Sequence, residues 1–127
     1  MKSLTQYIQE KLVIKKNTSK NYKYFPNTKE ELREIIEQRI KKEGKKANLN
    51  DIDVSKIKDM SNLFNGTDFN GDISNWDVSN VTDMSYMFYN CNNFNKDISQ
   101  WDVSSIKYNS NIFSNCLIEE KYKPKFK

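Results

Sequence analysis

Two stretches of the sequence decide how the chain is organised. They read DISNWDVS at Asp72–Ser79 and DISQWDVS at Asp97–Ser104, an offset of 25 residues. A third copy, Ile52–Ser61, matches Trp76–Ser85 at an offset of 24, and the one missing residue lies in the loop after Phe64. Stacked repeats tolerate such a change in a loop when its flanks are intact. The chain therefore contains an internal repeat, and this repeat governs the interpretation of the fold.

Each repeat carries two hydrophobic patterns. Ile73, Trp76 and Val78 have the spacing of an extended segment, which resembles the LxxLxL strand of leucine-rich repeats. After the turn-prone Ser79–Asn80, a second group has the spacing of one side of a short helix or 3₁₀ turn: Val81, Met84, Met87 and Phe88. Such a unit cannot bury its apolar side alone, so its neighbours must supply the core. The sequence predicts an α/β fold, a short leucine-rich-repeat-like solenoid with an N-terminal α-helical cap.

The predicted organisation has three parts: a helical cap at 1–50, the repeats at 51–116 and a basic tail at 117–127. In the cap, Ser3 with Gln6 forms a capping-box signature, followed by apolar residues at helical spacing. These residues are Leu4, Tyr7, Ile8 and Leu12.

A second helix is expected after Pro26. Thr28 pairs with Glu31 as a capping box, and Gly44 provides the stop. Acidic residues in its first turn and lysines in its last turn complement the helix dipole. Its apolar stripe consists of Leu32, Ile35, Ile36 and Ile40, which we expect to pack on the first repeat.

The last repeat departs from the others. Asn109 stands where the second repeat has Met84, and Tyr108 where it has Asp83, which predicts a polar end at which stacking stops. The tail after Cys116 alternates charged and aromatic residues. Two interpretations stay open for it: a lid that folds back on the repeats, or a mobile segment.

Composition excludes several classes of protein. Aromatic residues make up 13% of the chain, which argues against disorder. No apolar run is long enough for a membrane span or a signal peptide, and the two cysteines are too few for a disulfide framework. With no histidine, no phosphate-binding loop and no metal-ligand spacing, we expect no enzyme activity, no cofactor and no metal. The expected location is the cytoplasm, or a virion if a phage encodes the chain.

Charge is segregated along the sequence. Residues 1–50 carry a net charge of +7, residues 51–116 a net charge of −5, and residues 117–127 a net charge of +2. A basic end can attract nucleic acid, but here the lysines alternate with glutamates along a helix. A solvated helix face is the interpretation we favour, so we do not expect nucleic acid to be the partner.

The repeats Phe69–Cys91 and Phe94–Ser105 resemble a known family. Their sequences, FNGDISNWDVSNVTDMSYMFYNC and FNKDISQWDVSS, are similar to the bacterial surface protein 26-residue repeat of BspA-like leucine-rich-repeat proteins and mycoplasma lipoproteins. The resemblance covers about residues 47–116. It implies a leucine-rich-repeat-like solenoid used in adhesion or protein binding, without catalysis.

Aspartates recur at fixed positions of the repeat. Aligned carboxylates in stacked coils repel one another unless a cation or backbone donors satisfy them. A calcium site or an acidic face for a basic partner is one interpretation. We favour another, in which each Asp accepts backbone N–H groups in an Asx turn. The aligned sets are Asp53, Asp77 and Asp102, then Asp59 and Asp83, then Asp72 and Asp97.

Most large side chains of the repeats are expected in the core. Trp76 and Trp101 are interpreted as core residues rather than ligand-stacking aromatics, and Cys91 and Cys116 as a buried pair of stacked thiols. The polar residues that alternate with the buried set on the concave strand face are the binding candidates. They are Asn75, Asp77, Ser79, Gln100, Asp102 and Ser104.

These observations predict a non-enzymatic module that binds a protein partner or forms a homo-oligomer, without a membrane anchor. A phage- or mobile-element-encoded structural or host-factor-inhibiting protein that self-associates is the alternative. A nucleic-acid binder that uses the basic cap is the third hypothesis. The few repeats favour assembly with another macromolecule, because each coil is stabilised only by its nearest neighbours.

Overall fold

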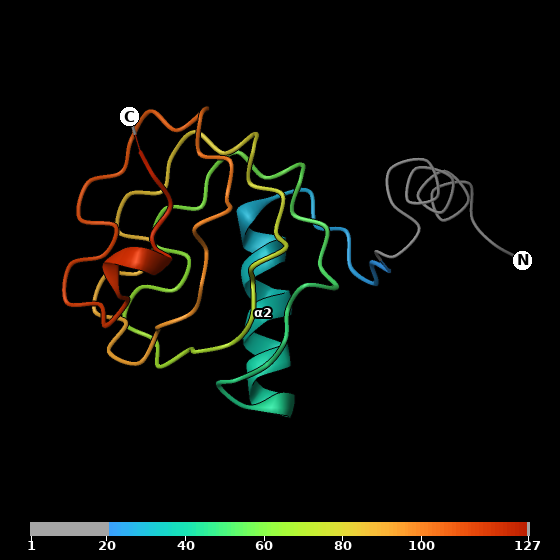
Figure 1. Cartoon of the computed structure of the whole chain (residues 1–127). Coiled ribbons are helices and arrows are strands. Elements are labelled where there is room, and N and C mark those ends of the chain that lie inside the picture. Colours follow the sequence, from blue (N-terminus) through green and yellow to red (C-terminus); the bar gives the residue numbers. More distant parts are fainter. Residues whose placement is uncertain (1–20, 127) are drawn as a thin grey trace, which may run out of the picture.

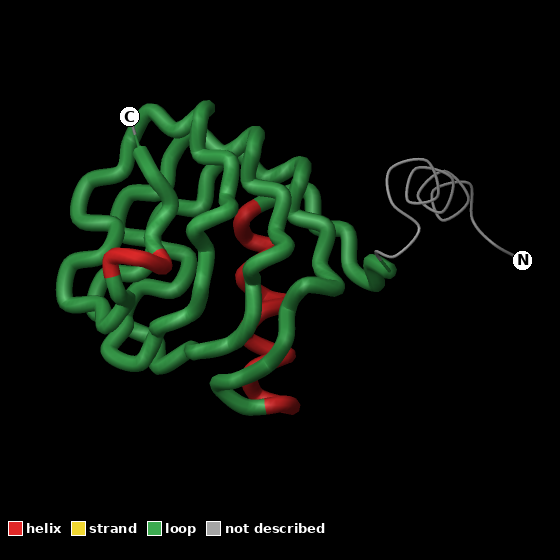
Figure 2. Tube along the Cα trace, viewed as in Figure 1, coloured by secondary structure: helices red, strands yellow, loops and turns green. Residues whose placement is uncertain are grey.

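The computed structural model describes residues 21–126. It contains one long helix, α2 at Lys29–Glu43, and one 3₁₀ helix, η1 at Glu120–Tyr122. The rest of the described chain consists of turns and irregular segments (Figures 1 and 2). The helix expected at residues 3–12 lies outside the described residues.

The expected fold class, an α/β leucine-rich-repeat-like solenoid, is wrong. The residues between 21 and 126 form no strand and no sheet. The strand-type pairings among these residues are isolated parallel bridges, each of which links one residue to one other. They connect Tyr24 with Ile52, Asn48 with Asp72, Asp59 with Asp83, and Asp83 with Tyr108.

Helix α2 forms as its sequence predicts. The Thr28 hydroxyl accepts a hydrogen bond from the Glu31 N–H at 3.1 Å, and the Glu31 carboxylate accepts one from the Asn27 N–H at 2.7 Å. The first bond satisfies one of the free donors at the helix start, and the second ties the residue before the N-cap to the first turn. The helix ends at Gly44, whose φ of 90° is open to glycine and whose N–H donates to the Ile40 carbonyl.

After α2 the chain winds through three stacked coils. We define coil 1 as residues 45–68, coil 2 as residues 69–93 and coil 3 as residues 94–117. Main-chain hydrogen bonds join equivalent positions of successive coils. The Phe64 N–H donates to the Met87 carbonyl at 2.9 Å, and the Phe88 N–H to the Ile112 carbonyl at 3.0 Å. The repeat in the sequence is therefore a repeat in space, built without strands.

Consecutive tight turns replace the helix that the spacing of Val81, Met84, Met87 and Phe88 predicted. The Met87 N–H donates to the Met84 carbonyl, and the Cys91 N–H to the Phe88 carbonyl, both at 3.1 Å. Left-handed residues four positions apart interrupt any helix, because a helix needs negative φ throughout. They are Asn62, Tyr86 and Asn111, with φ of 53° to 61°, and Gly66, Asn90 and Asn115, with φ of 57° to 74°.

Turns also replace the strand expected at Ile73, Trp76 and Val78. The Trp76 N–H donates to the Ile73 carbonyl at 3.2 Å, and the Val81 N–H donates to the Val78 carbonyl at 3.0 Å. All three apolar side chains are buried nonetheless. The hydrophobic pattern thus identified the core residues correctly and their backbone conformation wrongly.

Aromatic rings run through the core in rows. Phe64, Phe88 and Phe113 stack with ring centroids 5.4 and 5.7 Å apart. Trp76 lies over Trp101 at 6.4 Å with an interplanar angle of 4°. Offset stacking at these distances adds to the stabilisation from burial. The expectation that both tryptophans are core residues is confirmed, since only 4% and 5% of their surface is exposed.

The two ends of the stack are covered differently. Helix α2 packs on coil 1, with Leu32 and Ile36 buried and Ile35 and Ile40 half-buried, as expected. At the other end, residues 119–126 fold back on coil 3, where the Ile98 N–H donates to the Tyr122 carbonyl at 3.0 Å. The described part of the tail is thus a lid, and η1 lies within it, at the far end of the stack from α2 (Figure 1).

Candidate functional site

Asx turns organise the polar surface of the coils. In each one, an aspartate Oδ1 accepts the N–H of the serine two residues further along, as in Asp72 with Ser74 at 2.9 Å and Asp77 with Ser79 at 3.1 Å. These bonds satisfy the carboxylates locally. The turn interpretation is confirmed for Asp53, Asp59, Asp72, Asp77, Asp83, Asp97 and Asp102.

Hydrogen bonding keeps several of these carboxylates ionised. For Asp97, hydrogen bonds from the Ser99 hydroxyl and N–H hold the pKa below its usual value. For Asp72, burial opposes ionisation, but bonds from the Ser74 N–H, Asn50 and the Ser74 hydroxyl outweigh it and lower the pKa. Within residues 21–126, no group of three or more His, Cys, Asp or Glu residues could hold a metal ion.

The predicted binding residues lie beside the tryptophan stack. Because no concave sheet exists in the described chain, they lie on turns instead of the expected strand face. Asp77 and Asp102 accept both the N–H and the hydroxyl of Ser79 and Ser104, so these pairs hold the turns. Asn75, Gln100, Asp102 and Ser104 are exposed, whereas Asp77 and Ser79 are half-buried.

Tryptophan side chains fix the spacing of this surface. The Trp76 indole N–H donates to the Leu49 carbonyl of coil 1 at 2.9 Å, and the Trp101 indole N–H donates to the Ile73 carbonyl of coil 2 at 3.1 Å. Each indole therefore joins its own coil to the preceding one. The exposed neighbours Asn75 and Gln100 occupy equivalent positions 25 residues apart. We call Asn75 and Gln100, with the turn pairs Asp77–Ser79 and Asp102–Ser104, the polar row.

A tyrosine that the sequence gave no reason to select lies near the polar row. Burial raises the pKa of Tyr22, and the charges of Asp53 and Asp77 raise it further. The phenol is therefore close enough to both carboxylates to sense their charge. Tyr22 lies in the segment before α2. The repeat does not extend to this segment, so the repeat pattern could not identify Tyr22.

Ion pairs join α2 to coil 1. Arg39 binds Glu43, the Asp51 carboxylate at 2.8 Å and the Asn48 carbonyl at 3.0 Å. Lys29 binds Asp59 at 3.2 Å. Asp51 is the coil 1 equivalent of Asn75, so this position of the first coil is used for attachment of the helix.

The two cysteines are free thiols in or near the core. Cys91 is buried and Cys116 is half-buried. Burial and the nearby Cys116 raise the pKa of Cys91 to about 11, and burial also raises the pKa of Cys116. Neutral thiols are poor nucleophiles, so both cysteines are packing residues. The expected buried pair is therefore correct for Cys91 and only partly correct for Cys116.

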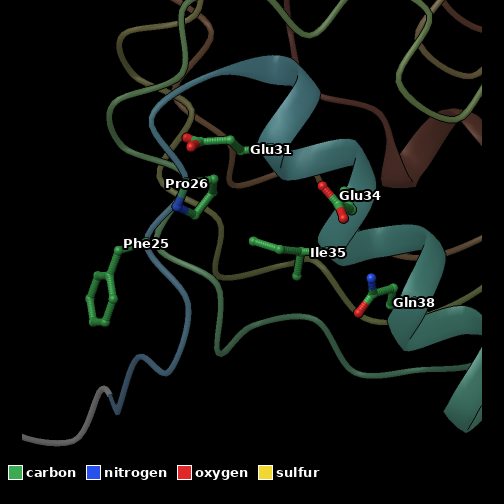
Figure 3. A pocket seen from close by; sticks show the side chains of 6 residues that line it. All are labelled: Phe25, Pro26, Glu31, Glu34, Ile35 and Gln38. Atoms are coloured by element: carbon green, nitrogen blue, oxygen red, sulfur yellow. The ribbon is translucent and has the colours of Figure 1, made fainter.

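A shallow hollow lies between the segment before α2 and one side of the helix (Figure 3). Phe25 and Pro26 line it from one side, and residues of α2 line it from the other. One lining residue, Glu31, already accepts a hydrogen bond from the Asn27 N–H at the start of the helix. The α2 residues are Glu31, Glu34, Ile35 and Gln38.

Repeated coils, a capping helix at one end and a polar surface held by local turns define a small repeat protein. The chain belongs to the family described as "Mycoplasma protein of unknown function, DUF285", whose model matches residues 30–121. This match does not confirm the narrower assignment to BspA-like leucine-rich repeats. No curated protein and no solved structure matches the chain. In the described part of the chain, no helix has the length and apolar character needed to cross a membrane.

Proposed function

We propose that the protein is a non-enzymatic protein-binding module that contacts its partner through the polar row. The observation that carries this proposal is the register of Asn75 and Gln100, two exposed amides beside tryptophans that lock successive coils together. A surface held rigid before binding loses little conformational entropy when a partner docks. The resemblance to repeats used in adhesion supports the same class of function.

The acidic side chains between these amides favour a partner with basic or hydrogen-bond-donating groups. Asp77 and Asp102 occupy equivalent positions. Asp102 is exposed, and Asp77 is half-buried. Complementary charge mainly improves the rate and the specificity of association. The two free thiols are consistent with a reducing compartment, so we place this activity in the cytoplasm.

The experiment replaces Asn75 and Gln100 together by arginine. In cells of the source organism, the partner is fixed by cross-linking and quantified by mass spectrometry. The double variant should recover at least about tenfold less partner, because two bulky cations would repel a basic partner surface. A loss of about 1.4 kcal/mol in binding free energy is enough for this tenfold change. Equal recovery by the variant and the wild type would refute the polar row as the contact.

A matched control places the same change elsewhere. Asn92 and Asn93 are exposed asparagines of coil 2 outside the polar row, and their replacement by arginine should leave recovery unchanged. Binding to nucleic acid would instead show a steep loss with increasing salt, because phosphate contacts release counterions. That outcome would favour the basic cap as the binding surface and contradict the proposal.

A further inference from the structure

In one segment of each coil, four backbone donors at alternate residues pair with the next coil. From coil 1 to coil 2 they are the N–H groups of Met60, Asn62, Phe64 and Gly66, which donate to carbonyls of coil 2 at 2.8 to 3.0 Å. From coil 2 to coil 3 they are the N–H groups of Met84, Tyr86, Phe88 and Asn90. In these segments the donors lie on the earlier coil and the acceptors on the later one. Just before them the direction is reversed, because the Thr82 N–H donates to the Lys58 carbonyl and the Lys107 N–H to the Thr82 carbonyl.

The four equivalent donors of coil 3 are unpaired within the described part of the chain. The equivalent N–H groups belong to Asn109, Asn111, Phe113 and Asn115, and none has an acceptor within residues 21–126. The lid is bound to coil 3 elsewhere, because the Glu119 N–H donates to the Asn95 side chain and the Tyr122 carbonyl accepts from the Ile98 N–H. We call residues 108–117 the open edge. Unpaired backbone groups in a row are a template for another polypeptide.

Exposed apolar side chains stand at both ends of the open edge. Tyr108 is 61% exposed and Leu117 is 62% exposed. The equivalent residues of coil 2 are Asp83 and Asn92, so the last coil has gained apolar surface where the previous coil is polar. Backbone donors alone would be satisfied by water, whereas exposed apolar side chains gain from being covered by a partner.

Charge around the open edge favours an acidic partner. Residues 105–126 contain four lysines and two glutamates. Lys123 lies over the Phe113 ring, with its Nζ 5.4 Å from the centroid, and Lys107 is exposed next to Tyr108. The coil segment that makes the same contact inside the protein begins with an aspartate, Asp83.

A second copy of this chain does not fit the open edge. Two open edges face to face would set donors against donors. The complementary acceptor edge belongs to coil 1, and α2 lies against it. Lys29 donates to the Ser61 carbonyl, which is on that edge, and Arg33 donates to the neighbouring Asn62 carbonyl. The segregated charge would favour head-to-tail pairing of copies, but α2 blocks the surface of coil 1 that this pairing requires.

We propose that the open edge docks a segment of a different polypeptide chain, acidic and apolar in composition, which continues the ladder of coil-to-coil hydrogen bonds. The segment runs parallel to residues 108–117 and presents carbonyl oxygens at alternate residues. Its apolar side chains cover Tyr108 and Leu117. This mode resembles the addition of a strand to a sheet edge, with turns in place of strands. The contact is separate from the polar row and does not depend on it.

The probe is a synthetic peptide with the sequence of residues 82–90, TDMSYMFYN, which accepts the same ladder inside the protein. It is titrated into the ¹⁵N-labelled full chain. The amide signals of Asn109, Asn111, Phe113 and Asn115 should shift, and their hydrogen exchange should slow at least tenfold at saturation. Amides already paired in coil 2 should not respond. No change at these four amides at millimolar peptide, or an equal change with a scrambled peptide, would refute the proposal.

A double variant tests the apolar ends without endangering the fold. Tyr108→Asp and Leu117→Asn install side chains with the character of the equivalent coil 2 residues, and the new aspartate can accept the Ser110 N–H as Asp83 accepts that of Ser85. The variant should keep the amide spectrum of a folded chain and bind the peptide at least tenfold more weakly. Unchanged affinity, or protection of the four amides through dimerisation without peptide, would overturn the assignment. Neither result bears on the partner bound by the polar row.

Discussion

The two ends of the coil stack differ in how the apolar side chains and backbone polar groups of the end coils are covered. At the N-terminal end, α2 buries Leu32 and Ile36 and satisfies carbonyls of coil 1 with Lys29 and Arg33. At the C-terminal end, the lid at residues 119–126 covers part of coil 3 and leaves four backbone donors free within the described chain. A repeat can therefore be closed at one end and open at the other, because its acceptor edge and its donor edge are different surfaces.

The contact between coils 1 and 2 should give the largest change in the free energy of unfolding. A Cβ at Gly71 would lie 1.9 Å from the Ala47 carbonyl oxygen and 2.5 Å from the Phe69 ring. Backbone cannot yield as a flexible side chain does, so Gly71→Ala should destabilise the protein by at least about 3 kcal/mol. Urea unfolding followed by circular dichroism measures the change.

Lys96 supplies the matched control for Gly71. It occupies the equivalent position of coil 3 and is exposed. Lys96→Ala should change the free energy of unfolding by less than about 0.5 kcal/mol. Similar losses for the two variants would show that the coils are not packed more closely near the capped end.

Attachment of α2 is the second test. Ile36 is 3% exposed and packs into the common core, so Ile36→Ala should cost about 2 to 4 kcal/mol. A loss below about 0.5 kcal/mol would mean that the helix is detached from coil 1 in solution. The comparison residue at the other end is Phe126, which is half-buried against the core. Phe126→Ala should cost less than Ile36→Ala if the lid closes the stack less tightly than the helix.

How much of this fold could be predicted depends on what each residue signals. The period, the buried aromatic rows and α2 follow from the sequence, because burial and capping leave direct patterns. The coil conformation did not follow, since apolar residues at i, i+3 and i+4 suit a helix and a run of turns equally well. Asn and Gly at positions 62, 66, 90, 111 and 115 were the available signal, as both residues tolerate positive φ. Tyr86 carries no such signal.

The surfaces were harder to predict than the core. The Asx turns were expected from Asp-x-Ser, but Tyr22 and Gly71 act through contacts distant in the sequence. The change from Met84 to Asn109 predicted a polar end to the stack. Asn109 is exposed, as that expectation requires, but Tyr108 and Leu117 also expose apolar surface there. Whether a side chain points outward at the last coil depends on where the lid lies, and the repeat contains no information on that.

The ion pair between α2 and coil 1 gives the smallest expected effect. Burial opposes ionisation of Asp59, but hydrogen bonds from Ser61 and Lys29 outweigh it and hold the pKa below its usual value. The Asp59 side chain is 52% exposed, so solvent screens the pair. Asp59→Asn keeps an oxygen for the turn and removes the charge, and should cost about 0.2 to 1 kcal/mol at pH 7.

The pH dependence separates the charge from the turn. Because the pKa of Asp59 is lower in the folded chain than in the unfolded chain, its ionised form stabilises the fold fully above about pH 4, the value for an unfolded aspartate. That contribution disappears as the pH falls through the lowered value, since both states are then protonated. The free energies of the wild type and Asp59→Asn should therefore differ at pH 7 and converge as the pH falls well below 4. A difference that persists undiminished in acid would assign the effect to turn geometry and remove the ion pair from the account of how α2 closes the stack.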